Sequence, residues 1–273
     1  MAAGRMWDKL DASFSGTGES VVVLANGLGT GQATWQPIVD AFSSRARFLR
    51  FDHAGMTAAT RAVFEPVRHD TLHGFADDLL ELLDEQGLRN ILLVGHSVSG
   101  MICSIAAAAA PDLIGRLVTV GASPCYVDDP ATAYHGGFTL DGVNAILESA
   151  ASDFQQWAAG FAPLAVGPEG SADGIAEFTN YLRRMGPDIG LRALRTIFLG
   201  DYRSVVPRVT QSVTVVQATE DIAVPRAVAE YLQRHLPRAE LVMLNSSGHV
   251  PQLTAPEELT AVLTRVLDEW YPR

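Results

Sequence analysis

The sequence has little of several features that define whole classes of protein. Its two cysteines, Cys103 and Cys125, are too few for a disulfide framework and lack the spacing of a metal site. No apolar run reaches the roughly 20 residues that a membrane-spanning helix needs, and the first residues lack the apolar segment of a secretory signal. We therefore expect a cytoplasmic protein that is not bound to a membrane. Nothing in the sequence implies a metal or an organic cofactor.

Positive charge is also scarce. The chain has 31 acidic and 20 basic residues, of which Lys9 is the only lysine, so its formal net charge is −11. Such a surface repels phosphate groups, which argues against nucleic acid or an anionic membrane as a partner. No cluster of basic residues is present to hold a phosphorylated substrate.

The pattern that the sequence does contain is an alternation of two kinds of segment. Short runs rich in β-branched residues or leucine alternate with longer amphipathic stretches, which is typical of a parallel sheet with helices on both faces. The expected strands are 20–27, 46–52, 90–96, 113–122, 212–221 and 239–249. The expected helices begin near Gln32 and cover 71–87, 97–111, 225–236 and 257–270. The chain is long enough to form such a core with an insertion.

The alternation stops between residues 123 and 211. This segment has no strand-like run, but two stretches, 139–161 and 175–198, have helical character, with a break at Pro187 in the second. A helical insertion of this kind is expected to fold as a lid over the carboxyl ends of the strands, where open α/β sheets keep their sites. We therefore predict an α/β core formed by 1–122 and 212–273, with residues 123–211 as the lid.

The first candidate site residue follows a buried strand. Gly95-His96-Ser97-Val98-Ser99 resembles Gly-x-Ser-x-Gly, a sharp turn between a strand and a helix that leaves the serine hydroxyl exposed. Ser99 takes the place of the second glycine, and Gly100 follows one position later. Ser97 is therefore a candidate nucleophile. Taken alone, the stretch is also compatible with a plain strand-to-helix junction.

Two further candidates follow two later strands. Asp221 comes after the strand that begins at residue 212, and His249 after the last strand. The order Ser–Asp–His, each at the carboxyl end of a strand, predicts a nucleophile, a general base and an acid that orients the base. His249 would take the proton from Ser97, whose own pKa is too high for unaided attack. Glu220 is adjacent to Asp221 and is the alternative acid.

The predicted chemistry also needs hydrogen-bond donors for an oxyanion. The candidates are the backbone N–H groups of Val98, next to the nucleophile, and of Leu28 in the loop "ANGLGTG". The other six histidines are expected to be structural. His96 should point away from the pocket, and His69, His73, His135 and His235 have no acidic partner in register. These six are His53, His69, His73, His96, His135 and His235.

With these residues in view, the chain from about residue 18 to 270 resembles an α/β-hydrolase. Within that superfamily it is similar to the branch of bacterial RsbQ-type stress regulators and plant strigolactone and karrikin receptors. The stretches that carry the resemblance are "VGHSVSGMI", "GASPCYVDD", "YHGGF", "WAAGFAPLAVG", "MGPDI" and "GHVPQLTAP". The fourth is the most specific, because it lies in the lid, where unrelated hydrolases diverge most. Ser99 also fits this branch.

The resemblance implies a lid of four helices over a deep apolar pocket. The residues it places in the pocket, each with core packing as the alternative, are Leu28, Tyr126, Phe138, Ile146, Trp157, Phe161, Phe178 and Phe198. Three departures from the family change the expected ligand shape. Asn26 stands where the generic hydrolase loop usually has histidine, Leu28 replaces a phenylalanine, and "DHAGMTAATRAVF" does not follow the family's usual pattern of glycines and serines.

Two functions are consistent with these residues. The first is a serine hydrolase that cleaves a small, largely apolar ester or lactone through an acyl-enzyme at Ser97, and the resemblance suggests a strigolactone-like or butenolide-like ligand. The second is a ligand-sensing protein that works with a signalling protein partner and whose slow hydrolysis reports occupancy. A third interpretation uses Ser97 and His249 for lyase or cofactor-free oxygen chemistry, but nothing in the sequence requires it.

Overall fold

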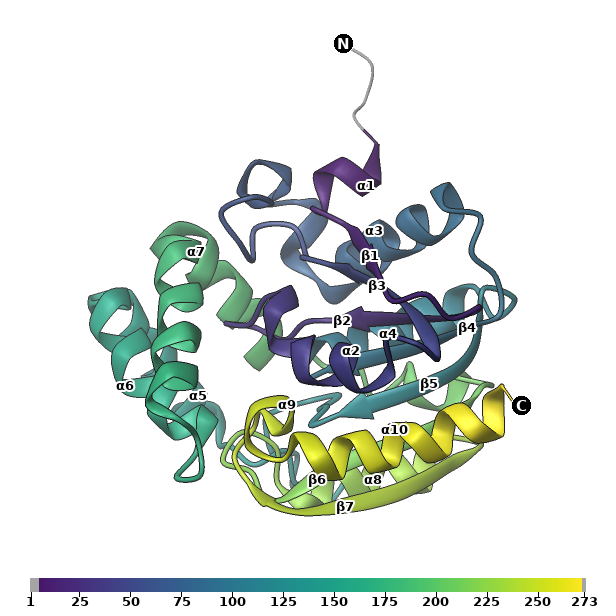
Figure 1. The fold of residues 1–273 in the computed structure, drawn as a ribbon. Coiled ribbons are helices and arrows are strands. Elements are labelled where there is room, and N and C mark those ends of the chain that lie inside the picture. Colours follow the sequence, from purple (N-terminus) through teal and green to yellow (C-terminus); the bar gives the residue numbers. More distant parts are fainter. Residues whose placement is uncertain (1–4, 272–273) are drawn as a thin grey trace.

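The computed structural model describes residues 5–271 and has a seven-stranded sheet at its centre (Figure 1). The strands lie in the order β1-β3-β2-β4-β5-β6-β7. Their bounds are β1 Ser13–Ser15, β2 Ser20–Ala25, β3 Ala46–Phe51, β4 Ile91–His96, β5 Ile114–Val120, β6 Ser212–Glu220 and β7 Ala239–Ser247. All neighbouring pairs are parallel except β1 with β3. The carboxyl ends of six strands therefore meet at one edge.

Helices cover both faces of this sheet. Those of the core are α1 Met6–Lys9, α2 Gln36–Phe42, α3 Leu72–Glu85, α4 Val98–Ala109, α8 Arg226–His235, α9 Pro251–Thr254 and α10 Pro256–Trp270. Alternate residues of β2 enter opposite hydrophobic clusters: Val23 joins residues of α3 and α4, and Val22 joins residues of α2 and α10. This alternation follows from the two-residue period of a strand. None of the helices within residues 5–271 is long and apolar enough to cross a bilayer.

The predicted fold class, a mostly parallel sheet flanked by helices, is confirmed. Each expected strand and helix of the core is present, with ends that differ by a few residues. Strand β1 was not predicted. It has three residues, all only partly buried, and it pairs with the edge of the sheet. A strand this short has no hydrophobic alternation for a sequence pattern to reveal.

Between β5 and β6 the chain forms a helical insertion (Figure 1). Its helices are α5 Leu140–Ser152, α6 Phe154–Val166 and α7 Ala172–Phe198. Helix α7 is interrupted at Gly186, whose φ of 77° is not helical, directly before Pro187. Because proline lacks an N–H and clashes with the preceding turn, it ends one helical run and another begins. The insertion thus has four helical runs.

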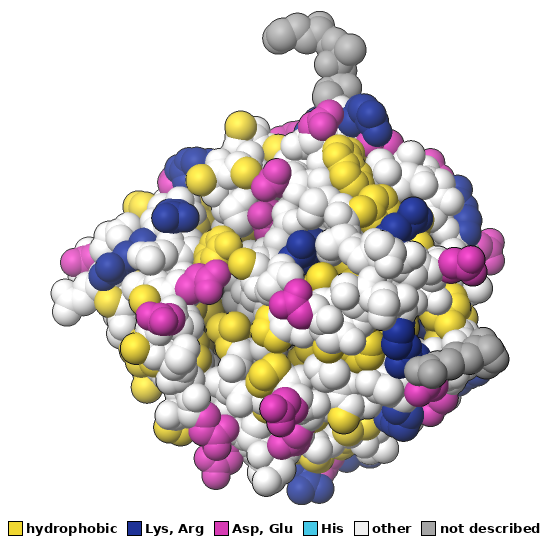
Figure 2. Space-filling view, viewed as in Figure 1, with side chains coloured by type: hydrophobic (Ala, Val, Ile, Leu, Met, Phe, Trp, Pro, Cys, Tyr) yellow, Lys and Arg dark blue, Asp and Glu magenta, His cyan; other side chains and the backbone are white. Residues whose placement is uncertain are grey.

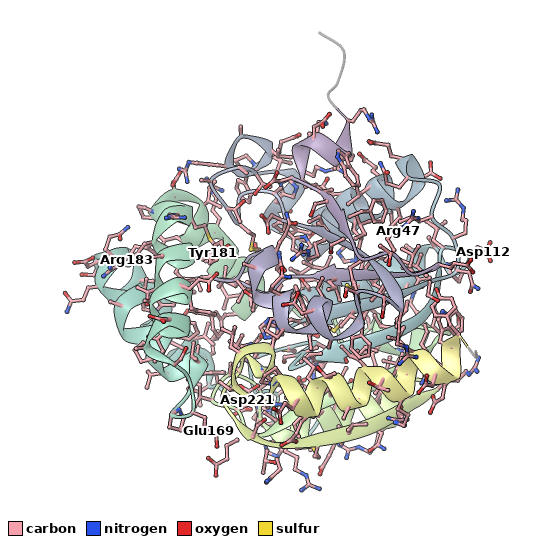
Figure 3. The ribbon with its side chains drawn as sticks, in the orientation of Figure 1. Arg47, Asp112, Glu169, Tyr181, Arg183 and Asp221 are labelled. Atoms are coloured by element: carbon pink, nitrogen blue, oxygen red, sulfur yellow. The ribbon has the colours of Figure 1, made fainter. Side chains whose placement is uncertain are left out.

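The insertion packs on the carboxyl ends of the strands. In Figure 1 it lies at the left-hand end of the sheet, and Figure 2 shows hydrophobic side chains gathered along its boundary with the core. Phe178 and Leu182 of α7 press on Gly29, just after β2. Figure 3 shows the neighbouring Tyr181 pointing toward the core, whereas Arg183 points outward. The buried face of α7 therefore covers the loop after β2.

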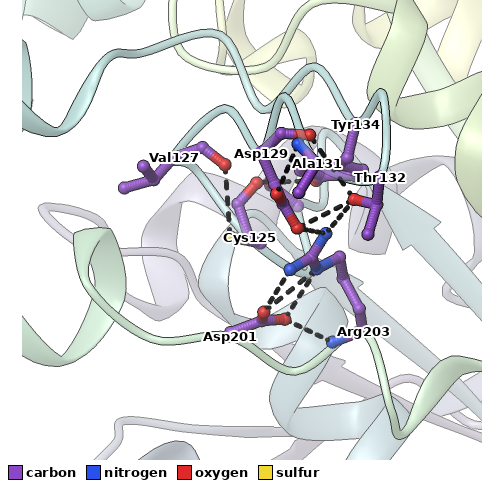
Figure 4. Close-up of polar contacts among 9 residues, drawn as sticks. Cys125, Val127, Asp129, Ala131, Thr132, Tyr134, Asp201 and Arg203 are labelled. Atoms are coloured by element: carbon purple, nitrogen blue, oxygen red, sulfur yellow. Dashed lines mark hydrogen bonds and ion pairs between the residues drawn. The ribbon is translucent and has the colours of Figure 1, made fainter.

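The two ends of the insertion are joined to each other where they meet the core (Figure 4). The Tyr202 N–H donates to the carbonyl oxygen of Pro124 at 2.7 Å. Arg203 forms ion pairs with Asp201 at 2.6 Å and with Asp129 at 3.0 Å. The contacts of Tyr202 with Pro124 and of Arg203 with Asp129 join the stretch before β6 to the stretch after β5. The Arg203–Asp201 pair lies within the stretch before β6. Together they hold the base of the insertion as a closed loop.

Candidate active site

Ser97 lies in the turn between β4 and α4 with φ 55° and ψ −125°. A positive φ is rare for a residue with a side chain, and strain of this kind occurs where surrounding packing imposes it. A side chain at Gly95 would collide with the Ser99 carbonyl, and one at Gly100 would collide with the Ala122 side chain. Both glycines therefore allow the tight approach that holds Ser97 at the tip of the turn.

The structure brings Ser97, His249 and Asp221 into one hydrogen-bonded series. The His249 Nε2 lies 2.7 Å from the Ser97 Oγ, and its Nδ1 lies 2.8 Å from the Asp221 Oδ2. An ionised carboxylate can only accept, so Nδ1 carries the proton and Nε2 accepts from the serine hydroxyl. The series therefore has the direction that proton transfer from Ser97 requires.

The Asp221 side chain is 1% exposed. Burial alone would raise the pKa of this carboxyl, but the facing His249 and the N–H groups of Ala223 and Val224 outweigh it and lower the pKa. Asp221 is therefore ionised where it contacts the imidazole. Glu220, the alternative acid, is exposed, and its carbonyl accepts from the Gly248 N–H.

The main chain of His249 is held from two sides. Its N–H donates to the Ala165 carbonyl at the end of α6 at 2.7 Å. Its carbonyl accepts from the Nε2 of His96 at 2.7 Å. This close approach needs glycine at 248, because a side chain there would collide with the Val166 carbonyl. Figure 3 shows Asp221 in the same area, where the insertion meets the core.

His96 contacts the backbone of His249 and is not among the residues that line the cavity described below. Burial, followed by the nearby His249, lowers the pKa of His96 to about 3. His96 is thus neutral at pH 7, and it donates through Nε2 to a carbonyl. It supports the candidate base rather than competing with it.

The two amides predicted as oxyanion donors belong to Val98, which follows Ser97 in the chain, and to Leu28. Val98 is the first residue of α4, and Leu28 lies in the loop after β2. A Cβ placed on Gly27 would be 3.1 Å from the Ser97 Cβ, so this loop passes directly against the serine. The Leu28 side chain packs against a hydrophobic cluster that joins Phe178 and Leu182 of the insertion with Val250 of the core.

A cavity of about 760 Å³ lies between α5, α6 and the loop after Asp221. Five residues that the sequence placed in the pocket line it: Phe138, Ile146, Trp157, Phe161 and Phe198. The stacked rings of Trp157 and Phe161, 5.0 Å apart, form one apolar wall. Most of its lining is therefore aromatic or aliphatic, which suits an apolar ligand.

The other three predicted pocket side chains, Leu28, Tyr126 and Phe178, do not line this cavity, and Tyr126 and Phe178 are buried beside it. The Tyr126 ring packs 5.0 Å from Phe198, and burial raises the pKa of its phenol while the Ser97 hydroxyl opposes the shift. Tyr126 thus connects Ser97 with the cavity wall. Phe178 packs against Gly29 and lies 6.3 Å from Phe161.

Sequence reasoning missed the polar side of the cavity. These residues follow Ile146 or flank Trp157 on the insertion helices: Ser149, Ser152, Asp153 and Gln156. Ile222 and Ala223, directly after Asp221, were also missed. Helical spacing of three or four residues from the predicted positions Ile146 and Trp157 could have found Ser149 and Asp153, but not Ser152 and Gln156.

The expectation that His69 lacks an acidic partner is wrong. Its Nε2 lies 2.9 Å from the Asp78 Oδ2, and both side chains are buried. The two residues are nine positions apart and come from different helices, so a search for partners in register on one helix does not reveal the pair. Within residues 5–271, no group of three or more His, Cys, Asp or Glu side chains could hold a metal ion.

The fold and this site define an α/β hydrolase. The family model described as the alpha/beta hydrolase fold matches residues 20–256, and the chain belongs to this family. Karrikin insensitive 2 receptor CA from Petunia hybrida is 39% identical to it over 92% of each chain. Strigolactone esterase D14 from Arabidopsis thaliana is 37% identical over 98% of this chain and 99% of its own.

Among solved structures, a hydrolase from Oleispira antarctica has a TM-score of 0.92 at 26% identity and covers 96% of each chain. The predicted resemblance to the strigolactone and karrikin receptor branch is confirmed by these relatives. The matches also support an esterase or hydrolase, as the sequence predicted.

Proposed function

We propose that the chain is a serine hydrolase that cleaves a small, largely apolar ester or lactone, with Ser97 as nucleophile. The observation that carries the proposal is the hydrogen-bonded series from Asp221 through His249 to a strained serine. Tyr126 lies between this serine and the wall of the apolar cavity, where its ring packs on Phe198. Serine needs a base within hydrogen-bond distance to attack a carbonyl.

The proposed reaction has two halves. His249 Nε2 takes the hydroxyl proton as Ser97 Oγ bonds to the carbonyl carbon. The N–H groups of Leu28 and Val98 would stabilise the oxyanion, each contributing about 3 kcal/mol. The intermediate then collapses, the alkoxide leaves with the proton from His249, and an acyl-enzyme remains. A water molecule, deprotonated by His249, releases the acid and restores Ser97.

The cavity indicates the substrate class. Its walls are mainly aromatic or aliphatic, and its polar side chains gather at Ser149, Ser152, Asp153 and Gln156. An apolar body with one ester or lactone group fits this distribution. The names of the relatives, a strigolactone esterase and a karrikin receptor, make a butenolide-like lactone the first natural ligand class to test.

A second candidate function is ligand sensing through a signalling protein partner. It is favoured by the bond between the His249 N–H and the Ala165 carbonyl, because this bond links the site directly to the helical insertion. In this proposal residues 123–211 act as a lid whose position depends on occupancy of the cavity. Hydrolysis would then be slow and would reset the lid.

Hydrolysis of p-nitrophenyl acetate by the wild type and by Ser97→Ala tests the proposed function. We expect the variant to lose kcat by a factor on the order of 10⁴ to 10⁶, with an unchanged melting temperature as the control for folding. Equal rates would reject Ser97 as the nucleophile.

Turnover separates the two candidate functions. Rapid multiple turnover of butenolide-like esters favours a metabolic esterase. A single slow turnover accompanied by a shift in melting temperature favours sensing.

A further inference from the structure

We infer that Thr30 and Ser99 are positioning residues that orient the two peptide units on either side of Gly27 and thereby aim the Leu28 N–H at the reacting carbonyl. The inference rests on the proposed function, because it concerns the oxyanion donor of that reaction. Neither residue touches the substrate in this account. Both act through the backbone.

Thr30 holds the peptide unit that contains the donor itself. Its Oγ1 donates to the Gly27 carbonyl at 2.8 Å, and the Thr30 side chain is almost fully buried. The Gly27 carbonyl and the Leu28 N–H belong to one planar trans peptide, so they point in opposite directions along a single plane. Holding the Gly27 oxygen therefore fixes the direction of the Leu28 N–H.

Ser99 holds the preceding peptide unit. Its Oγ donates to the Asn26 carbonyl, and the same Oγ lies 2.7 Å from the Nε2 of His53. Because the hydroxyl has one proton, which goes to the carbonyl, His53 must donate through Nε2. Burial lowers the pKa of His53 to about 4, so its ring is neutral at pH 7 and can take this tautomer. The departure from Gly-x-Ser-x-Gly thus supplies a bond that glycine could not make.

The start of the loop is also tied to the neighbouring strand. The Asn26 Nδ2 donates to the Phe51 carbonyl at 2.9 Å and to the Asp52 Oδ1 at 2.8 Å. Gly27 packs so closely on the site that a Cβ there would lie 2.6 Å from the His96 Nδ1. Translation of the loop is therefore blocked, and rotation of its peptide planes is the freedom that Thr30 and Ser99 remove.

An ordinary turn does not need the Thr30 hydroxyl. The Thr30 N–H already donates to the Gly27 carbonyl at 3.3 Å, and this bond remains when the hydroxyl is removed. A purely structural hydroxyl would change the melting temperature and leave kcat unchanged. A positioning hydroxyl would lower kcat with little effect on KM, because the donor acts mainly on the transition state.

The experiment compares Thr30→Val with Thr30→Ser, which differ in whether a hydroxyl remains. With p-nitrophenyl acetate we expect Thr30→Val to lower kcat by about 10- to 100-fold, less than the 10²- to 10³-fold typical of a deleted donor. KM should stay within about twofold, and Thr30→Ser should recover most of the wild-type kcat. Wild-type kcat in Thr30→Val, or no recovery in Thr30→Ser, would overturn the role of Thr30.

Ser99→Ala gives an independent measurement should Thr30→Val not fold. It removes the hydroxyl while keeping a small side chain, and we expect kcat to fall by about tenfold. An unchanged kcat in folded Ser99→Ala would overturn the role of Ser99. The matched control is Thr264→Val on α10, which removes a 2.8 Å bond to the Thr260 carbonyl away from the site. It should retain wild-type kcat.

The inference and the proposed function can fail separately. Wild-type activity equal to that of Ser97→Ala would reject the proposed function before any variant of the loop is measured. If activity depends on Ser97 but both Thr30→Val and Ser99→Ala keep the wild-type kcat, only the inference is rejected.

Discussion

Residues 5–271 contain two buried pairs of histidine and aspartate, which differ in what contacts the second nitrogen of the imidazole ring. In one pair the His249 Nδ1 lies 2.8 Å from Asp221, and its Nε2 faces the Ser97 hydroxyl. In the other the His69 Nε2 lies 2.9 Å from Asp78, and its Nδ1 accepts from the Glu65 N–H at 2.9 Å. The two rings are therefore opposite tautomers.

The difference explains why only one pair is a candidate active site. His69 has both nitrogens occupied by the protein, and its partner Asp78 also binds Arg68 at 2.6 Å. His249 keeps a nitrogen free to accept the proton of the Ser97 hydroxyl. A buried imidazole and carboxylate are therefore insufficient for catalysis. The free acceptor and the strained serine make the distinction.

The largest expected effect comes from breaking the first pair. Asp221→Asn should lower kcat for p-nitrophenyl acetate by about 10⁴-fold, because the amide favours the wrong tautomer of His249. Glu220→Gln is the matched control, since its exposed side chain lies outside the series. A large loss in Glu220→Gln with none in Asp221→Asn would reverse the assignment of the acid.

The second pair should affect stability rather than activity. Asp78→Asn leaves Arg68 and His69 without their buried charged partner, and we expect a loss of about 3–5 kcal/mol in the free energy of unfolding. Urea denaturation measures this loss. The kcat of the protein that remains folded should stay within about threefold of wild type, whereas a loss like that of Asp221→Asn would make the two pairs equivalent.

Asp52 is a third buried aspartate, to be compared with Asp221 and Asp78. It accepts a hydrogen bond from the amide of Asn26 rather than from an imidazole. Burial, followed by the charge of Asp11, raises the pKa of Asp52 from 3.8 to about 6. Between these values the folded chain binds more protons than the unfolded one, so stability decreases as pH rises. The difference in unfolding free energy between wild type and Asp52→Asn should shift by up to about 3 kcal/mol from pH 4 to pH 7.

A pH-independent difference between these two proteins would contradict that prediction. The measurement is urea denaturation at several pH values, because subtracting the variant removes the titration of other groups. The opposite slope is expected for Asp221, whose lowered pKa adds stability that is lost on acidification.

The smallest effect concerns the aromatic wall of the cavity between α5 and α6. Trp157→Ala removes one of the stacked rings from the wall and should raise KM for an apolar ester by about 5- to 30-fold. For p-nitrophenyl acetate, which has a small acyl group, KM should change less. A uniform loss of kcat for both substrates would instead point to displacement of the insertion.

Much of this site could be predicted from the sequence because its signals are local. Ser97 was found from a turn that needs small residues on either side, and His249 from its position after a strand. The partner of His69 could not be found, because Asp78 belongs to another helix and a contact of that kind has no periodic signal. The bond of Ser99 to the Asn26 carbonyl was equally inaccessible, since it joins segments 73 positions apart.

The sequence by itself determined the layered fold, the order of the three candidate residues and the apolar character of the insertion, because periodicity and turn chemistry are properties of neighbouring residues. Tertiary structure decided which acid contacts His249, which ring nitrogen is free, and how the loop that carries Leu28 is held. Those outcomes depend on distances between segments far apart in the chain, and such distances exist only after packing has brought the segments together.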